Sequence, residues 1–187
     1  MRLLIFGAGV LGSFYAVKLL ACGHEVTLLA RGRRATQLRA DGLVVHEHGR
    51  GCLRARVDVI ESLDPEASYD HVLVLVRQDQ VESVLPSLAA SKATPNLVFM
   101  FNNLAGPQRL VKVLGRDRIV LGFPGAAGER TADGRVVATV LPALIQKTTL
   151  GEVDGRSTAR IRALAAALKQ AGFPTAVSSQ LDAWLNT

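Results

Sequence analysis

A strand-like apolar run near the start of the chain leads directly into a glycine-rich turn and then into a helix-like segment. Residues 3–6 are apolar, Gly7-x-Gly9-x-x-Gly12 follows, and the next turns stay apolar and free of proline. In such a unit the first glycine allows the sharp turn, the second lets a diphosphate approach bare backbone, and the third lets the helix lie close to the strand. The helix amino terminus also offers free N–H groups and the positive end of its dipole to an anion.

A second strand-like run, residues 24–30, follows at the spacing of a βαβ unit. A lone glycine pattern also occurs in ordinary turns, but this context favours a dinucleotide-binding site. The sequence therefore predicts that the turn and the first residues of the helix contact the cofactor: Gly7, Ala8, Gly9, Val10, Leu11 and Gly12.

The end of the second strand carries arginine where NAD-binding folds usually carry an acidic residue. In those folds Asp or Glu hydrogen-bonds the ribose 2′-hydroxyl group, whereas here Ala30 is followed by Arg31. A carboxylate would repel a 2′-phosphate, and a guanidinium would bind it through its planar fork of donors. We therefore predict NADP(H) as the cofactor, with Arg31 as the main contact and Arg34 as a second one. The alternative is a solvated basic start of a surface helix.

Three further apolar runs are continuous rather than alternating: residues 71–76, 96–101 and 119–122. Continuous apolar strands are typical of parallel sheets that helices cover on both faces. Helix-like segments separate these runs along the chain. The sequence therefore predicts an α/β fold, a Rossmann-like doubly wound parallel sheet.

Polar residues stand where two of these strands end, and the carboxyl ends of strands are where open α/β sheets bind ligands. Arg77 follows the run at 71–76, and Asn102 and Asn103 follow the run at 96–101. Two neighbouring amides can donate to a carbonyl group and accept from a ribose. Asparagine is also a favoured helix cap, and the pattern alone does not choose between the two roles.

The last third of the chain has a different pattern. Small residues fill a loop at 123–128, including Ala127, and such a loop can approach a ligand closely. Asp133-Gly134 is a hairpin signal, with strands expected at 135–141 and 144–150, which would add antiparallel strands at the far edge of the sheet. Ser157 is the expected cap of a final long helix.

Histidine and cysteine give little sign of a metal or disulfide framework. His46 and His48 could share one face of a strand, but a catalytic zinc site needs a third protein ligand, and no such cluster is present in the sequence. Cys22 and Cys52 form no CxxC pair, and we expect both to be buried thiols.

Size and charge limit the function classes. A chain of 187 residues is long enough for one α/β domain with some extra structure. Lys and Arg exceed Asp and Glu by 22 to 16, but these charges are scattered and aromatic residues make up only 5%, so we expect no nucleic-acid partner. The apolar segments are too short to cross a membrane and no signal peptide is evident, so we expect a cytoplasmic protein.

Taken together, the sequence resembles the amino-terminal domain of the ketopantoate reductase (2-dehydropantoate 2-reductase) family. The order of the motifs is far more specific than any one of them, and they span nearly all of the chain. The motifs are Gly7-Ala-Gly9-Val-Leu-Gly12, Arg31, Leu73-Val-Leu-Val-Arg77-Gln-Asp-Gln80, Phe101-Asn102-Asn103-Leu-Ala-Gly106 and Asp182-Ala-Trp184-Leu-Asn186.

The resemblance implies an enzyme of pantothenate synthesis that reduces a 2-keto acid with NADPH and closes its cleft with a helical carboxyl-terminal domain. It implies that residues 1–178 form the NADP-binding domain, that 179–187 begin the inter-domain helix, and that the second domain is missing. Asn102 matches an asparagine that contacts nicotinamide ribose and substrate. Arg77 replaces a lysine of the family, and Asn186 stands at the position of its catalytic lysine.

An amide cannot donate a proton to a developing alkoxide as an ammonium group can. Two hypotheses therefore follow from the resemblance. The chain is either a keto-acid reductase or a catalytically silent NADP(H)-binding module. In the second case it is either a truncated product that needs a partner chain or a sensor of the redox state. For the protein in general, the expected partners are a small keto acid and either a second copy of the chain or a complementing carboxyl-terminal chain.

Overall fold

A mixed sheet of eight strands forms the centre of the protein within residues 1–101, 106–132 and 134–180, which the computed structural model describes. Its strand order is β12-β11-β8-β7-β6-β1-β2-β5. The strands are β1 (Arg2–Phe6), β2 (Glu25–Leu29), β5 (Asp58–Ile60), β6 (His71–Val74), β7 (Leu97–Met100), β8 (Ile119–Phe123), β11 (Thr148–Glu152) and β12 (Thr175–Val177).

This sheet is doubly wound. β1 pairs in parallel with β2 on one side and with β6 on the other, so the chain reverses its direction of winding beside β1. β7 and β8 continue the parallel order, and β11 then pairs antiparallel to β8, with β12 parallel to β11 at the edge. The predicted fold class, a Rossmann-like parallel sheet with antiparallel edge strands, is confirmed.

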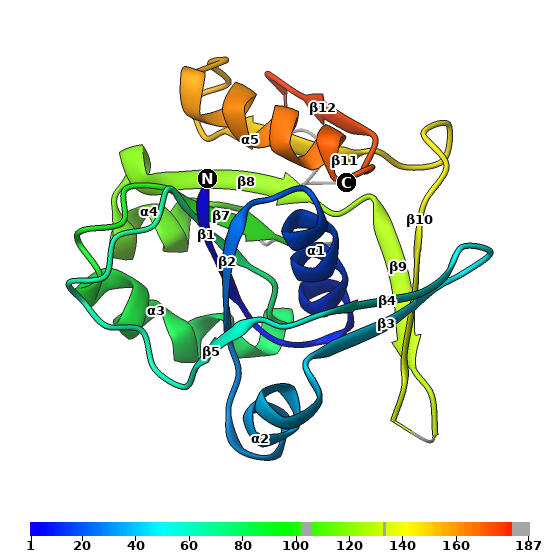
Figure 1. Ribbon diagram of the computed structural model, residues 1–187. Coiled ribbons are helices and arrows are strands. Elements are labelled where there is room, and N and C mark those ends of the chain that lie inside the picture. Colours follow the sequence, from blue (N-terminus) through cyan, green and yellow to red (C-terminus); the bar gives the residue numbers. More distant parts are fainter. Residues whose placement is uncertain (102–105, 133, 181–187) are drawn as a thin grey trace.

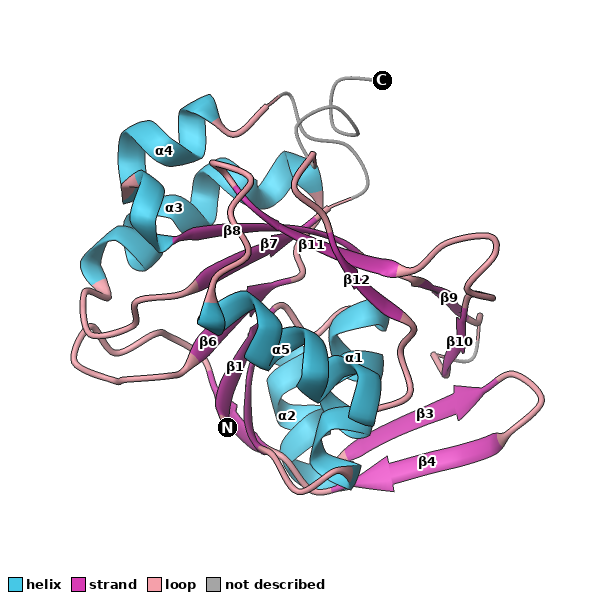
Figure 2. Cartoon of the chain, turned by 90° about the horizontal axis from the view of Figure 1, so that it is seen from above, coloured by secondary structure: helices cyan, strands magenta, loops and turns pink. Residues whose placement is uncertain are grey.

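Helices cover both faces of the sheet (Figures 1 and 2). Successive residues of β1 alternate between the two sides: Leu3 and Ile5 pack towards α1 and α5, whereas Leu4 and Phe6 pack towards α3 and α4. The helices are α1 (Val10–Ala21), α2 (Gly32–Asp41), α3 (Val81–Ala90), α4 (Gln108–Leu114) and α5 (Ala159–Gln170), with short 3₁₀ turns at Gln78–Gln80 and Arg116–Arg118.

A second sheet, which the sequence did not predict, stands beside α1 (Figure 1). In the described part of the chain it has four strands in the order β4-β3-β10-β9. They are β3 (Leu43–Glu47), β4 (Gly51–Ala55), β9 (Ala126–Arg130) and β10 (Val136–Val140).

A hairpin turn exists around residue 134 as expected, but the strand predicted to pair with residues 135–141 was wrong. Residues 136–140 pair antiparallel with β9, not with residues 144–150, and they join the second sheet rather than the edge of the first. The reason is the small residues of β9: a Cβ atom on Gly128 would lie 2.7 Å from Val10 Cγ1 and 2.4 Å from the Val137 oxygen. A strand with a side chain there could not lie this close to α1.

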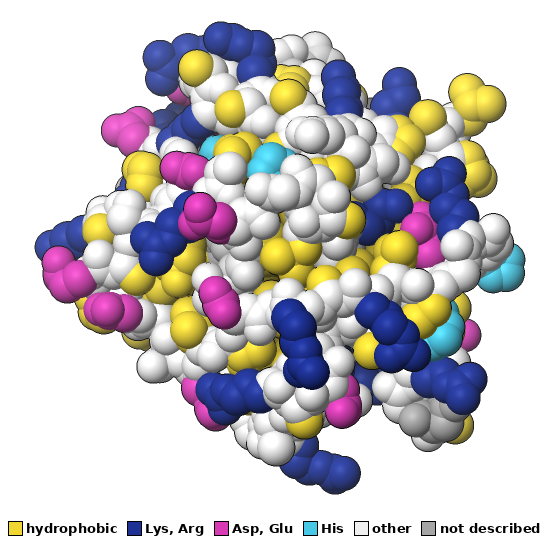
Figure 3. All heavy atoms as spheres, viewed as in Figure 1, with side chains coloured by type: hydrophobic (Ala, Val, Ile, Leu, Met, Phe, Trp, Pro, Cys, Tyr) yellow, Lys and Arg dark blue, Asp and Glu magenta, His cyan; other side chains and the backbone are white. Residues whose placement is uncertain are grey.

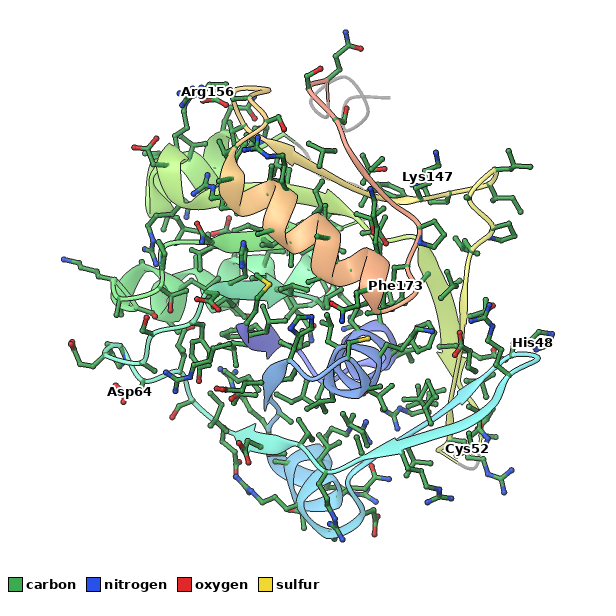
Figure 4. All side chains as sticks on the ribbon, turned by 45° about the horizontal axis from the view of Figure 1, so that its top comes forward. His48, Cys52, Asp64, Lys147, Arg156 and Phe173 are labelled. Atoms are coloured by element: carbon green, nitrogen blue, oxygen red, sulfur yellow. The ribbon has the colours of Figure 1, made fainter. Side chains whose placement is uncertain are left out.

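Two smaller expectations were also wrong. Thr158, not Ser157, precedes the first turn of α5, and its hydroxyl group donates to Glu152 and accepts no hydrogen bond from the N–H groups of the helix. Cys52 is exposed on β4 and Cys22 is half-buried, so neither is a fully buried thiol. Figure 4 shows Cys52 and His48 on the β3–β4 hairpin, which projects from the body of the protein.

The second sheet is attached to α1 through a buried ion pair. Lys18 Nζ lies 3.0 Å and 3.2 Å from the two carboxylate oxygens of Glu47, and the side chains of the pair are only 10% and 5% exposed. The ammonium group also lies 5.3 Å from the ring centre of Phe14 and 5.5 Å from that of Phe173. α1, β3 and the end of α5 therefore meet at one charged contact in an apolar environment.

Tyr15 joins α1 to the edge of the large sheet. Its ring stacks on Phe173 at 4.2 Å, beside the end of α5 (Figure 4). Its hydroxyl group shares a 2.8 Å hydrogen bond with Thr148 Oγ1, which also accepts from the Gly125 N–H group. Burial raises the pKa of Tyr15 well above its ordinary value of 10.0.

We expect a Tyr15→Phe variant to lose about 1 kcal/mol of unfolding free energy at pH 8, because the buried Thr148 hydroxyl group loses one of its two hydrogen bonds. The raised pKa means that burial of the neutral phenol stabilises the fold below about pH 10 and that this contribution is lost as the pH rises above that value. Urea unfolding at pH 8 and at about pH 10.5 should therefore show a smaller pH-dependent loss for the variant than for the wild-type protein. Equal losses would contradict this.

Candidate cofactor-binding site

A cleft of about 990 Å³ opens at the carboxyl ends of β1, β2 and β6, where the winding of the sheet reverses. Open α/β sheets bind ligands at this place. The lining residues are Phe6, Gly7, Ala8, Gly9, Leu29, Ala30, Arg31, Arg33, Arg34, Gln37, Leu75, Val76, Arg77, Gln80, Ser83, Val84, Arg130 and Gly134.

The three glycines of the first turn occupy different environments. Gly7 has a φ of +119°, a conformation that L side chains rarely adopt. A Cβ atom on Gly12 would lie 1.9 Å from the Gly7 carbonyl oxygen, so the helix lies directly against the turn. A Cβ atom on Gly9 would meet nothing within 4 Å. The turn at Gly7 and the close approach at Gly12 have the geometry expected from the motif, and the space beside Gly9 is open.

The amino terminus of α1 is free of side-chain caps. Gly9 is its N-cap residue, no side chain caps its N–H groups, and its first turn contains no acidic residue. The first N–H groups of a helix have no partner within the helix, and the dipole adds a partial positive charge there. This end of α1 is therefore suited to bind the diphosphate of a dinucleotide.

Arg34 lies over this turn more closely than Arg31 does. Arg34 Nε donates to the Ala8 carbonyl oxygen at 3.2 Å, and its Nη2 donates to Ser13 Oγ at 2.9 Å. Arg31 is exposed, and its Nε donates to the Glu61 carbonyl oxygen at 3.3 Å. The structure thus places both predicted arginines in the cleft, with the half-buried Arg34 directly beside the start of α1.

The environment of Arg34 is electrostatically unfavourable for a cation. Burial and, second, the positive charge of Arg130 lower the pKa of Arg34 to about 10. The group remains charged at neutral pH. Its described hydrogen-bond acceptors, Ala8, Ser13 and Gln37, are all neutral.

The cleft as a whole is basic. Its described lining includes five arginines and no carboxylate. Arg77, at the end of β6, has an exposed ion pair with Asp79 at 3.0 Å. Figure 3 shows Lys and Arg side chains over α2 and the neighbouring end of the second sheet. Such a site favours a ligand that carries several negative charges.

Some predicted residues lie elsewhere. Val10, Leu11 and Gly12 are in α1 and do not line the cleft, and Ala127 is an exposed residue of β9 outside the lining. Asn102 and Asn186 lie outside the described residues. Four further polar residues of the lining were not predicted: Arg33, Gln37, Ser83 and Arg130. Arg130 comes from the second sheet and had no signal in the sequence.

Neither a metal site nor a membrane span is found in the part of the chain that the structure describes. No three His, Cys, Asp or Glu side chains there are close enough to hold a metal ion. No described helix combines the length and the apolar character needed to cross a membrane.

The fold and the site define a Rossmann-like α/β protein with a glycine turn that opens into a basic cleft. The particular family follows from comparison with known proteins. The chain belongs to the ketopantoate reductase family, because the family model described as Ketopantoate reductase PanE/ApbA matches residues 3–155.

Individual relatives agree with this assignment. The 2-dehydropantoate 2-reductase of Archaeoglobus fulgidus is 31% identical over 92% of this chain and 54% of its own length. The crystal structure of 2-dehydropantoate 2-reductase from Geobacter metallireducens is 26% identical, with a TM-score of 0.84 over 99% of this chain and 60% of that one. A D-mandelate dehydrogenase solved with NADH and anilino(oxo)acetate shares the fold at 19% identity, with a TM-score of 0.76 over 95% of this chain and 57% of that one.

The chain is shorter than these proteins. It spans between 54% and 61% of the length of the relatives that it matches in sequence. The family is one of 2-keto acid reductases, and the matched part is its amino-terminal domain.

Proposed function

We propose that this chain is the NADP(H)-binding part of an oxidoreductase that reduces a 2-keto acid similar to ketopantoate to a 2-hydroxy acid. The observation that carries the proposal is the basic cleft over an uncapped helix start, with Arg31 between β2 and α2, Arg34 in the first turn of α2, and no described carboxylate in its lining. Family membership supports the keto acid as substrate. The solved relative with NADH supports a nicotinamide nucleotide, and the arginines favour its 2′-phosphorylated form.

Each part of the cleft has a separate task in this proposal. The glycine turn and the start of α1 bind the diphosphate, and the arginines at the end of β2 bind the 2′-phosphate. A reduced nicotinamide, when bound, supplies the hydride that a carbonyl carbon accepts. Asn102 is proposed to orient the carbonyl group, and Asn186 stands at the position of the proton-donating lysine of the family. Residues 1–178 are proposed as the cofactor domain, with 179–187 starting the next helix and the cytoplasm as the location.

Loss of NADPH absorbance at 340 nm with ketopantoate and related keto acids tests this function. Turnover by this chain, alone or with a carboxyl-terminal domain of the family added as a separate chain, would support a reductase. Tight NADPH binding without turnover in either mixture would favour the second candidate, a catalytically silent binding module. That candidate is motivated by Asn186, and it predicts that Asn186→Lys restores no activity.

An Arg31→Ala variant should bind NADPH at least about tenfold more weakly than the wild-type protein, because it lacks one charge-assisted contact with the 2′-phosphate. Its affinity for NADH should change less than about twofold. Fluorescence titration with both nucleotides measures the two effects. A wild-type preference for NADH would show that the assignment of the arginines is wrong.

A further inference from the structure

The β9–β10 hairpin brings a guanidinium group to the cleft from a distant part of the chain. Arg130, at the end of β9, and Gly134 line the cleft together with the glycine turn and the start of α2. Arg130 Nη1 donates to the Gly134 carbonyl oxygen at 3.0 Å, across the hairpin turn. This neutral acceptor orients the guanidinium group without cancelling its charge.

Arg130 and Arg34 increase the positive potential of the same region. The charge of Arg130 is close enough to contribute to the lowered pKa of Arg34, after burial. The described hydrogen-bond acceptors of both groups are neutral, and Arg34 lies beside the positive end of the α1 dipole. Like charges held together at a helix amino terminus are unfavourable, and an anion between them would relieve the repulsion.

We propose that Arg130 joins Arg31 and Arg34 in binding a phosphate monoester, the 2′-phosphate of NADP(H), so that the second sheet helps to select the cofactor. This inference rests on the proposed function, because it assigns a further residue to the same cleft. Arg130 would be a specificity-determining residue that contacts the cofactor. A monoester carries nearly two negative charges at neutral pH, and its three terminal oxygens can accept hydrogen bonds from several guanidinium groups. The bridging diphosphate already has the N–H groups of the glycine turn as donors.

Affinities for four ligands distinguish a contact between Arg130 and the 2′-phosphate from a general effect on nucleotide binding. The ligands are NADPH, NADH, adenosine 2′,5′-bisphosphate and 5′-AMP. We expect Arg130→Gln to weaken binding of the two 2′-phosphorylated ligands by about tenfold or more. Binding of NADH and 5′-AMP should change less than about twofold. The affinity of Arg130→Lys for the 2′-phosphorylated ligands should lie between that of Arg130→Gln and that of the wild-type protein, because lysine keeps the charge but not the planar fork of donors. Calorimetric titration measures all affinities.

Arg54→Gln is the matched control, since Arg54 is an exposed arginine of β4, in the same sheet, that does not line the cleft. It should change none of the four affinities, and thermal unfolding should show that both variants are folded. Unchanged affinities in Arg130→Gln, or an equal loss for all four ligands, would overturn the role of Arg130. These results are distinct from a failure of the proposed function, in which the wild-type protein reduces no keto acid or binds none of the four ligands.

Discussion

A Gly12→Ala variant is expected to be destabilised by about 3 kcal/mol and to lose most of its dinucleotide affinity. The new Cβ atom would lie 1.9 Å from the Gly7 carbonyl oxygen and 3.3 Å from Ile5 Cγ2. The first of these atoms belongs to the backbone of a turn with a positive φ, so it cannot move away as a flexible side chain could. Alanine favours a helix over glycine by about 1 kcal/mol, which is too little to offset the clash.

Urea unfolding and NADPH titration measure the two losses, and Gly9→Ala is the matched control. Its Cβ atom would meet no protein atom within 4 Å, so the fold should keep its stability within about 0.5 kcal/mol. The methyl group would point into the space that we propose for the diphosphate, and NADPH affinity should then fall by about tenfold or more. A Gly12→Ala protein as stable as the wild type would show that α1 does not lie as close to β1 as described.

A Lys18→Met variant is expected to be destabilised by about 3 kcal/mol or more, because it leaves the Glu47 carboxylate buried without its main partner. Arg50 lies at 4.0 Å from Glu47 but is mostly exposed, so it compensates only weakly. Since this pair attaches the second sheet to α1, we also expect weaker NADPH binding through displacement of the β9–β10 hairpin. Chemical unfolding and nucleotide titration give the two readouts.

The double variant Lys18→Met/Glu47→Leu should recover most of the lost stability, because it removes both charges from the apolar contact. The exposed pair between Arg39 and Glu61, at 2.7 Å, gives a control. Arg39→Met should cost about 1 kcal/mol at most, since exposed ion pairs are screened by solvent. A Lys18→Met protein no less stable than Arg39→Met would contradict the role assigned to the buried pair.

Local sequence patterns were enough to predict the parallel strands at the centre of the large sheet. The continuous apolar runs that became β6, β7 and β8 indicated buried parallel strands, and the glycine motif located the first turn and α1. The strand that became β10 was recognised, but its neighbour was not. Strand pairing depends on which surface each strand can approach, and the contact of Gly128 with Val10 leaves no trace in the spacing of residues 123–128.

The residues of the candidate site divide in the same way, into those that the sequence predicted and those that only the fold brings to the cleft. Residues close in sequence to the first βα turn and to the end of β2 were found from their motifs, because backbone geometry there depends on neighbouring residues. Arg130 had no such signal, since an isolated arginine in a polar segment is typical of any surface. Its place in the cleft depends on the folding of β9 against α1.

The sequence by itself determined the βαβ unit, the basic residues at the end of β2 and the family to which the chain belongs. These depend on glycine conformation, apolar periodicity and residues only a few positions apart. Only the tertiary structure decided how the strands divide between two sheets, that Lys18 and Glu47 attach the second sheet to α1, and that Arg130 reaches the cleft. Those features arise from close packing between segments distant in the chain, where the fit of small residues and the pairing of buried charges select one arrangement.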